Sequence, residues 1–155
     1  MADFADITIL EVELSKSAAL VEKALDDILS PTDGHEGRVV EAMRYAALAG
    51  GKRLRPFLVL SSASLFDIDE NRAMRVACAL ECVHTYSLIH DDLPCMDDDD
   101  MRRGQPTIHK EFDEATAVLA GDALLTFAFE ILADIRTHED ARVRCELITG
   151  LAKAS

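Results

Sequence analysis

Apolar residues recur at helical spacing along most of the chain, and no segment shows the sustained two-residue alternation of a half-buried strand. Proline, glycine and acidic residues mark the ends of six predicted helices, at about 7–29, 37–49, 56–66, 69–92, 113–135 and 139–151. The fourth and fifth helices are apolar on nearly every face, so they should lie at the centre of the fold. The pattern predicts a single all-α domain over residues 1–155.

Proline at position 94 sets the end of the fourth predicted helix. Inside a helix, Pro94 would remove a backbone hydrogen bond and clash with the carbonyl of His90. The chain should therefore leave helical geometry near Leu93, and a turn there would fold Asp97 back towards Asp91. Two carboxylates, one from a helix and one from a loop, would then converge on a common cation.

Composition narrows the classes of partner and compartment. A formal net charge of −13 opposes binding to nucleic acid, whose phosphates would be repelled over a large surface. The most apolar stretch, 115–133, is interrupted by Asp122 and Glu130, so we expect no membrane span. Residues 1–17 lack the basic start and the apolar core of a signal peptide, which favours a cytoplasmic protein.

The four cysteines are too sparse for a disulfide framework. Cys78 and Cys82 lie one helical turn apart, which is compatible with a metal site. Because cysteine is among the residues most often buried, small core thiols in a reducing cytosol are the favoured interpretation.

Six of the ten residues from Asp91 to Asp100 are aspartates, and Arg102 and Arg103 follow them. So many carboxylates repel one another unless cations lie among them, and hard divalent cations such as Mg²⁺ take oxygen ligands. Guanidinium groups match phosphate oxygens in a bidentate fork. An EF-hand loop is excluded, because its required glycine and glutamate would fall on Arg102 and Ile108. The block indicates a diphosphate site built on Mg²⁺, and the alternative is a solvated acidic loop.

A second basic segment, GGKRLRP at 50–56, leads into the third predicted helix. It is not a P-loop, because Ala46 replaces the first glycine and Arg53 replaces the serine or threonine after the lysine. Basic residues at a helix N-terminus favour anions through the free N–H groups and the helix dipole. The segment is either a second phosphate site or a solvated basic turn.

Three segments together resemble the trans-isoprenyl diphosphate synthases, and within them the bacterial farnesyl/geranylgeranyl diphosphate synthase branch. They are GGKRLRP at 50–56, ECVHTYSLIHDDLPCMDDDDMRRGQPTIHK at 81–110 and ATAVLAGDALLTFAFEIL at 115–132. The resemblance implies an all-α, isoprenoid-synthase-type helical bundle, here truncated to about its first six helices. It also implies a Mg²⁺-dependent prenyltransferase that condenses an allylic diphosphate, dimethylallyl or geranyl, with isopentenyl diphosphate.

The resemblance implies roles for individual residues. Asp91 and Asp97 correspond to the family's first aspartate-rich motif, which binds Mg²⁺, while Asp92 and Asp98 should balance charge beside them. Arg102 corresponds to the arginine that binds the allylic diphosphate. The residues that correspond to the isopentenyl diphosphate site are Lys52, Arg55, His84 and Arg103.

The length of the product should depend on Tyr86 and Ser87, which precede Asp91 by five and four residues, where the family sets the floor of its cavity. The bulk of Tyr86, together with the inserted Cys95 and Met96, favours the C15 product farnesyl diphosphate. The C20 product, geranylgeranyl diphosphate, stays open, as does a purely structural role for Tyr86 as a core aromatic.

The family's second aspartate-rich motif, and the later lysine and glutamine that contact the allylic substrate, have no counterpart in the sequence. We therefore expect little or no turnover by the 155 residues alone. The favoured interpretation is a partial form of a longer synthase. A short subunit that is silent without another chain, and an interaction module that keeps an old acidic block, stay open. The family and the uncovered apolar helix faces favour a homodimer. A class I terpene cyclase is disfavoured, because GGKRLRP serves a second diphosphate.

Overall fold

A computed structural model describes residues 4–155, with side chains from Thr8 onward. The predicted absence of a signal peptide falls partly on residues 1–3, outside the described residues. The elements in order are α1 (Phe4–Ile28), α2 (Gly37–Ala47), α3 (Leu54–Ser64), α4 (Glu70–Asp91), β1 (Met101–Arg102), β2 (Gln105–Pro106), α5 (Ile108–Glu111), α6 (Glu114–Ala133) and α7 (Ala141–Ala154). The all-α fold is confirmed.

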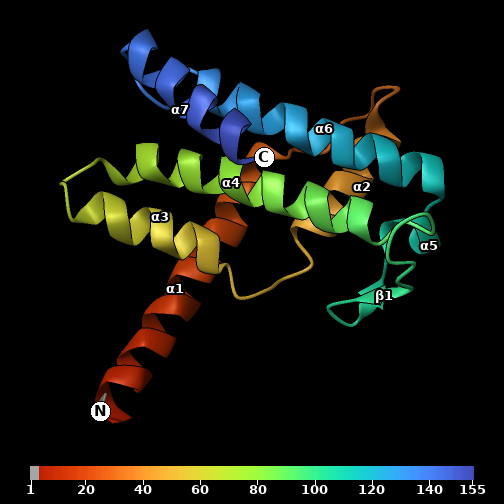
Figure 1. Ribbon diagram of the computed structural model, residues 1–155, viewed down its shortest axis with the longest axis horizontal. Coiled ribbons are helices and arrows are strands. Elements are labelled where there is room, and N and C mark those ends of the chain that lie inside the picture. The colour runs from red at the N-terminus through yellow and green to blue at the C-terminus, as the bar shows by residue number, and fades with distance from the viewer. Residues whose placement is uncertain (1–3) are drawn as a thin grey trace.

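Helices α4 and α6 form the centre of the bundle, as their apolar character predicts (Figure 1). Each begins at an aspartate that caps the helix: Asp69 accepts a hydrogen bond from the N–H of Arg72 at 3.0 Å, and Asp113 from that of Thr116 at 2.7 Å. Small residues on the two helices, such as Ala77 and Ala120, are fully buried. Their small side chains bring the two backbones close together, which fixes the direction of α4.

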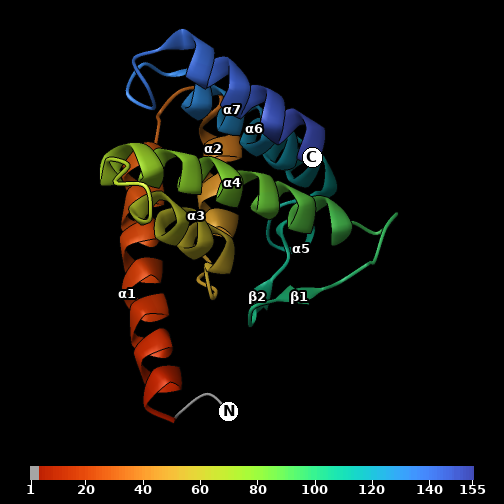
Figure 2. The ribbon, with the colours of Figure 1, turned by 60° about the vertical axis from the view of Figure 1, so that its left-hand side comes forward.

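Helix α1 belongs to the core only at its C-terminal end. Val21 and Leu25 are fully buried there, whereas Ile9 is 62% exposed. The N-terminal half of α1 stands away from the bundle in both ribbon views (Figure 2). Ile9, Leu10 and Val12 of that half are therefore uncovered.

The segment between α4 and α6 is more ordered than the sequence pattern predicts. A two-residue turn at Arg103 and Gly104, with φ of +51° and +80°, pairs β1 with β2 in an antiparallel hairpin. Two successive residues with positive φ are the signature of the tight turn that matches strand twist. The one-turn helix α5 follows, and the hairpin lies below α5 and the C-terminal part of α4 in Figure 2. The sequence analysis did not predict this hairpin.

The buried cysteines and the apolar helix α6 bear on two predictions made from composition. Cys78 and Cys82 are buried, as favoured, and burial raises the pKa of Cys78 to about 12, which leaves it a thiol rather than a metal-binding thiolate. Among the described helices, α6 is long and apolar enough to cross a membrane by length and composition. Core helices share those properties, and α6 packs along α4 and α2.

An apolar groove of about 430 Å³ lies between α4, α6 and α7. Leu80 of α4, Leu132 of α6 and Leu147 of α7 line it. No residue of α7 is buried. The outer face of the bundle therefore carries an uncovered apolar channel, in line with the expectation of uncovered apolar helix faces.

Candidate functional site

The acidic block begins at the C-terminus of α4 and turns back upon it. The N–H of Asp97 donates to the carbonyl of Asp91 at 2.8 Å, and the N–H of Asp98 donates to that of Leu93 at 3.1 Å. A left-handed φ of +54° at Asp98 completes the turn. The backbone fold-back predicted from Pro94 is confirmed.

Asp92 and Arg102 form a fork at the base of this turn. The Nε of Arg102 lies 2.8 and 2.7 Å from the two carboxylate oxygens of Asp92, and Nη2 lies 2.5 Å from one of them. Asp92 is only 3% exposed, and this hydrogen bonding raises the pKa of Arg102. Asp92 thus balances the charge of Arg102 rather than that of a metal ion. The pair also links β1 to the end of α4.

The remaining aspartates divide into paired and free groups. Asp99 lies 3.3 Å from Nη2 of Arg102, and Asp100 lies 2.8 Å from Nζ of Lys110. Within the described part of the chain, the carboxylates of Asp91 and Asp97 make no hydrogen bond or ion pair, nor does that of Asp98. Free carboxylates that share one turn are available as ligands.

Arg103 joins the acidic turn to the basic segment. Its Nη1 donates to the carbonyl of Gly50, and its guanidinium lies over Gly51. The backbone at Gly51 has a φ of +127°, which favours glycine, and a Cβ there would lie 2.8 Å from Cζ of Arg103, the movable end of a long side chain. The two segments that the sequence marked for phosphate therefore meet in space.

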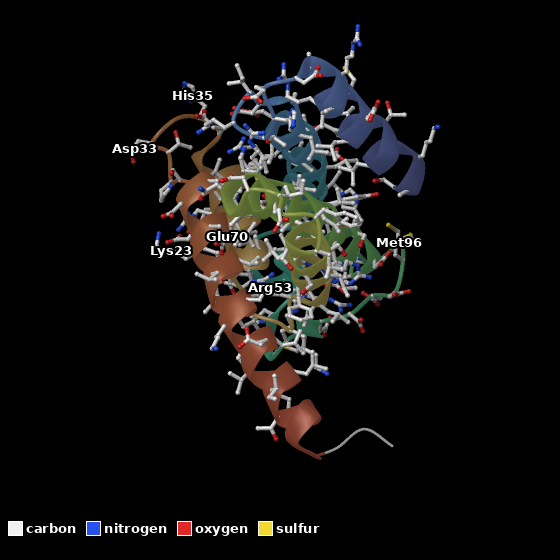
Figure 3. All side chains as sticks on the ribbon, turned by 90° about the vertical axis from the view of Figure 1, so that its left-hand side faces the viewer. Lys23, Asp33, His35, Arg53, Glu70 and Met96 are labelled. Carbon is white, nitrogen blue, oxygen red and sulfur yellow. The ribbon has the colours of Figure 1, made fainter. Side chains whose placement is uncertain are left out.

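A buried ion pair holds the basic segment against α4. Nη1 of Arg53 lies 2.7 Å from the carboxylate of Glu81, and Nη2 donates to the carbonyl of Ala47 at 2.6 Å. Both side chains are buried, whereas their neighbours Lys52 and Arg55 are exposed (Figure 3 labels Arg53 within the bundle). The sequence analysis missed this pair, although a glutamate inside an otherwise apolar central helix signalled a buried partner.

The pKa of His84 depends on its burial and on the charged groups around it. Burial and then the positive charge of Arg55 lower the pKa of His84, and Arg103 and Arg102 act in the same direction. Side chains from the basic segment, the hairpin and α4 are thus close enough to interact. The lowered pKa of His84 favours the neutral imidazole near pH 7.

Tyr86 and Ser87 lie about one turn before Asp91 and are half-buried. The ring of Tyr86 packs edge-to-face on His90, with centroids 5.6 Å apart, and Oγ of Ser87 donates to the carbonyl of His84 at 2.9 Å. The imidazole of His90 lies against Gly121, where a Cβ would come within 2.1 Å of its Nε2. This contact seats α6 on α4 just below the aspartates.

Comparison with known proteins identifies the family to which these segments belong. A family model described as polyprenyl synthetase matches residues 36–154. This chain belongs to the polyprenyl synthetase family. The resemblance found in the sequence is thereby confirmed.

Within the family, the chain is 50% identical over 144 residues to the farnesyl diphosphate synthase of Escherichia coli, which covers 92% of this chain and 48% of that protein. It is 59% identical over 122 residues to a heterodimeric geranylgeranyl pyrophosphate synthase large subunit of Arabidopsis thaliana, covering 79% of this chain and 32% of that one. An FPP/GFPP synthase structure from Zymomonas mobilis superposes with a TM-score of 0.92 at 52% identity, covering 96% of this chain and 53% of that chain. The chain thus spans about half the length, or less, of these relatives.

The described residues of this polyprenyl synthetase chain suit Mg²⁺. Asp91 and Asp97 supply oxygen donors alone, the ligand type that Mg²⁺ prefers, and both carboxylates are unpaired among the described residues. Leu80, His84, Ser87 and Asp91 share one face of α4 because they recur at helical spacing. That face connects the aspartates at one end with the apolar groove about 16 Å away at the other.

Proposed function

We propose that this chain forms the diphosphate-binding part of a short-chain prenyltransferase that joins an allylic diphosphate to isopentenyl diphosphate. The observation that carries the proposal is the convergence of three segments at one end of α4. Free carboxylates lie on the acidic turn at the end of α4, and the hairpin that follows this turn carries Arg103, which contacts the glycines of the basic segment. The free carboxylates suit a diphosphate that binds through a bridging cation. The basic residues suit a diphosphate that binds without one.

Asp91 and Asp97 would hold Mg²⁺, which supplies electrostatic stabilisation for a diphosphate leaving group. Arg102 binds the allylic diphosphate, and its fixed guanidinium favours the charge that develops as the allylic C–O bond breaks. The second diphosphate, that of isopentenyl diphosphate, is bound by Lys52, Arg55, His84 and Arg103. The double bond of isopentenyl diphosphate then attacks the allylic cation, and a proton passes from the resulting cation to the released diphosphate, which forms the new double bond.

The apolar groove between α4, α6 and α7 is the path for the hydrocarbon chain. The groove begins on the face of α4 that bears Asp91, so a prenyl chain anchored at the aspartates lies along Leu80 and Leu132. Apolar walls exclude the water that would quench a carbocation. Tyr86, half-buried just below the aspartates, limits the product to farnesyl diphosphate, and geranylgeranyl diphosphate is the alternative product. The protein acts in the cytoplasm as a homodimer.

A second candidate function is that of a subunit that is silent without another chain. The uncovered groove along α7 favours it, because an apolar channel of this size is usually covered in a soluble protein. A relative 59% identical over its matched region is named as the large subunit of a heterodimeric geranylgeranyl pyrophosphate synthase. An interaction module that keeps an unused acidic block is the remaining alternative.

Binding and turnover are tested separately. Titration calorimetry with inorganic pyrophosphate and Mg²⁺ should show binding to the chain, and the Asp91→Asn and Asp97→Asn variants should lose it. A radiometric assay with isopentenyl and dimethylallyl diphosphates should show little turnover by the chain alone. Addition of the C-terminal half of the E. coli relative should produce farnesyl diphosphate. Pyrophosphate binding that is unaffected in both variants would overturn the proposal.

A further inference from the structure

Three side chains that could hold a metal ion gather between the acidic turn and α5. Ligand atoms of Asp98, Asp100 and His109 all lie within 4.8 Å of one another. The aspartates are exposed, whereas His109, on α5, is only 8% exposed. Neither Asp98 nor Asp100 belongs to the pair assigned to Mg²⁺, so this cluster serves no step proposed above.

The imidazole of His109 has one nitrogen engaged and one free. Thr107 donates its hydroxyl proton to the carbonyl of Asp99 at 2.8 Å. The contact of 3.2 Å between that hydroxyl and Nδ1 of His109 is therefore made by an Nδ1–H donor. Nε2 then carries the lone pair, and within the described residues this buried atom has no hydrogen-bond partner. Metal-binding histidines usually have this arrangement, with the second ring nitrogen held by an oxygen.

We propose that Asp98, Asp100 and His109 form a Zn²⁺ site distinct from the Mg²⁺ pair, independent of the proposed function. One imidazole nitrogen and two carboxylates favour Zn²⁺ over Mg²⁺, because imidazole suits zinc whereas magnesium takes oxygen ligands. With Zn–N and Zn–O bonds of ~2.0–2.2 Å, two ligand atoms of a tetrahedral Zn²⁺ ion lie ~3.3–3.6 Å apart. The three ligand atoms lie within 4.8 Å of one another, and both aspartates are exposed, so their side chains can rotate towards that spacing. Water completes the coordination.

Lys110 competes with the metal for one ligand. Its Nζ lies 2.8 Å from the carboxylate of Asp100, so that Zn²⁺ must displace or share this exposed ammonium group. The two cations repel each other, and removal of the lysine charge should tighten Zn²⁺ binding. A built site is separated from general attraction of cations to an acidic surface by comparing aspartate variants, because Asp98→Asn, Asp100→Asn and Asp91→Asn each remove one negative charge but only the first two remove a proposed ligand.

The test is a calorimetric titration of the 155-residue chain with ZnCl₂ in excess Mg²⁺, which keeps Asp91 and Asp97 occupied. We expect one Zn²⁺ per chain, and in NMR spectra the ring nitrogens of His109 should shift while those of the other four histidines stay in place. Asp98→Asn and Asp100→Asn should each lower the affinity by about tenfold or more. Lys110→Met should raise it, and Asp91→Asn should leave it unchanged.

Three results would overturn the proposal. They are an absence of Zn²⁺ binding, an unmoved His109 resonance, and a loss of affinity in Asp91→Asn as large as in Asp98→Asn. Unchanged affinity in Lys110→Met would show that Asp100 is not a ligand, which also contradicts the proposal. His109→Gln should abolish binding, and if that variant fails to fold, the two exposed aspartates still decide the question.

Discussion

The sharpest stability prediction concerns the buried ion pair between Arg53 and Glu81. Glu81→Gln keeps the shape of the side chain and removes its charge, which leaves the guanidinium of Arg53 buried without a counter-ion. The side chains of Arg53 and Glu81 are only 1% and 2% exposed, so water cannot solvate the remaining charge. The variant therefore isolates the electrostatic contribution of a single pair.

The magnitude follows from the geometry. At the observed separation of 2.7 Å, two unit charges attract by about 6 kcal/mol at an effective dielectric constant of ~20. The cost of taking both charges out of water offsets much of this attraction in the intact protein. Removal of one partner from a buried pair typically costs ~3–5 kcal/mol, because the desolvation of the other charge is no longer compensated. We expect a loss in that range, which is a large part of the stability of a domain of this size.

Urea unfolding followed by circular dichroism measures the free energy of unfolding directly. The matched control is Glu139→Gln, because Glu139 pairs with Arg72 at 3.1 Å while being 75% exposed. We expect that control to change stability by less than ~0.5 kcal/mol. The double variant Arg53→Met, Glu81→Met should recover most of the loss, since an apolar pair of similar volume needs no counter-ion. A loss below ~1 kcal/mol in Glu81→Gln would refute the reasoning.

Further predictions concern the cysteines, His84 and Gly121. Iodoacetamide should modify the native protein at the two exposed cysteines, Cys95 and Cys145, and should reach Cys78 and Cys82 only after unfolding. Intact mass counts the modified cysteines. Modification of all four in the native protein would contradict the burial of Cys78 and Cys82. The pKa of His84, followed by NMR, should start below its ordinary value of ~6.5 and rise when inorganic pyrophosphate binds, whereas the ring signals of the exposed His35 should not shift at constant pH. Because folding lowers the pKa of His84, the unfolded chain binds more protons, so the contribution of His84 to stability is lost as the pH falls below ~6.5 and through the lower pKa of the folded state. Gly121→Ala should cost ~1–3 kcal/mol in thermal unfolding by its clash with His90, and His90→Ala should rescue it.

The sequence predicts the six longer helices well because each is long enough to show its period and is bounded by a proline, a glycine or an acidic cap, whereas the one-turn helix α5 is too short to be predicted. Asp69 and Asp113 cap α4 and α6 at the predicted places. The β1–β2 hairpin escaped prediction because strands of two residues are too short to show an alternating pattern. Its turn at Arg103 and Gly104 is fixed by backbone conformation and by contact with the basic segment.

The candidate site also has a part that the sequence predicts and a part that it does not. The carboxylates and cations of the acidic block and of GGKRLRP are recognisable from local spacing, and the fold-back of Asp97 follows from Pro94. Pairings between distant positions are not visible in a periodic pattern. Arg53 and Glu81 are 28 residues apart, so only tertiary structure brings them together. The same holds for Asp100 and His109.

The fork between Asp92 and Arg102 leaves one edge of the guanidinium open. Its Nε and Nη2 groups donate to acidic side chains, whereas Nη1 has no hydrogen-bond partner among the described residues. A guanidinium that is anchored on one edge can accept an anion on the other without losing its internal counter-ion. The proposed diphosphate would therefore add to the contacts of Arg102 and would not have to displace Asp92.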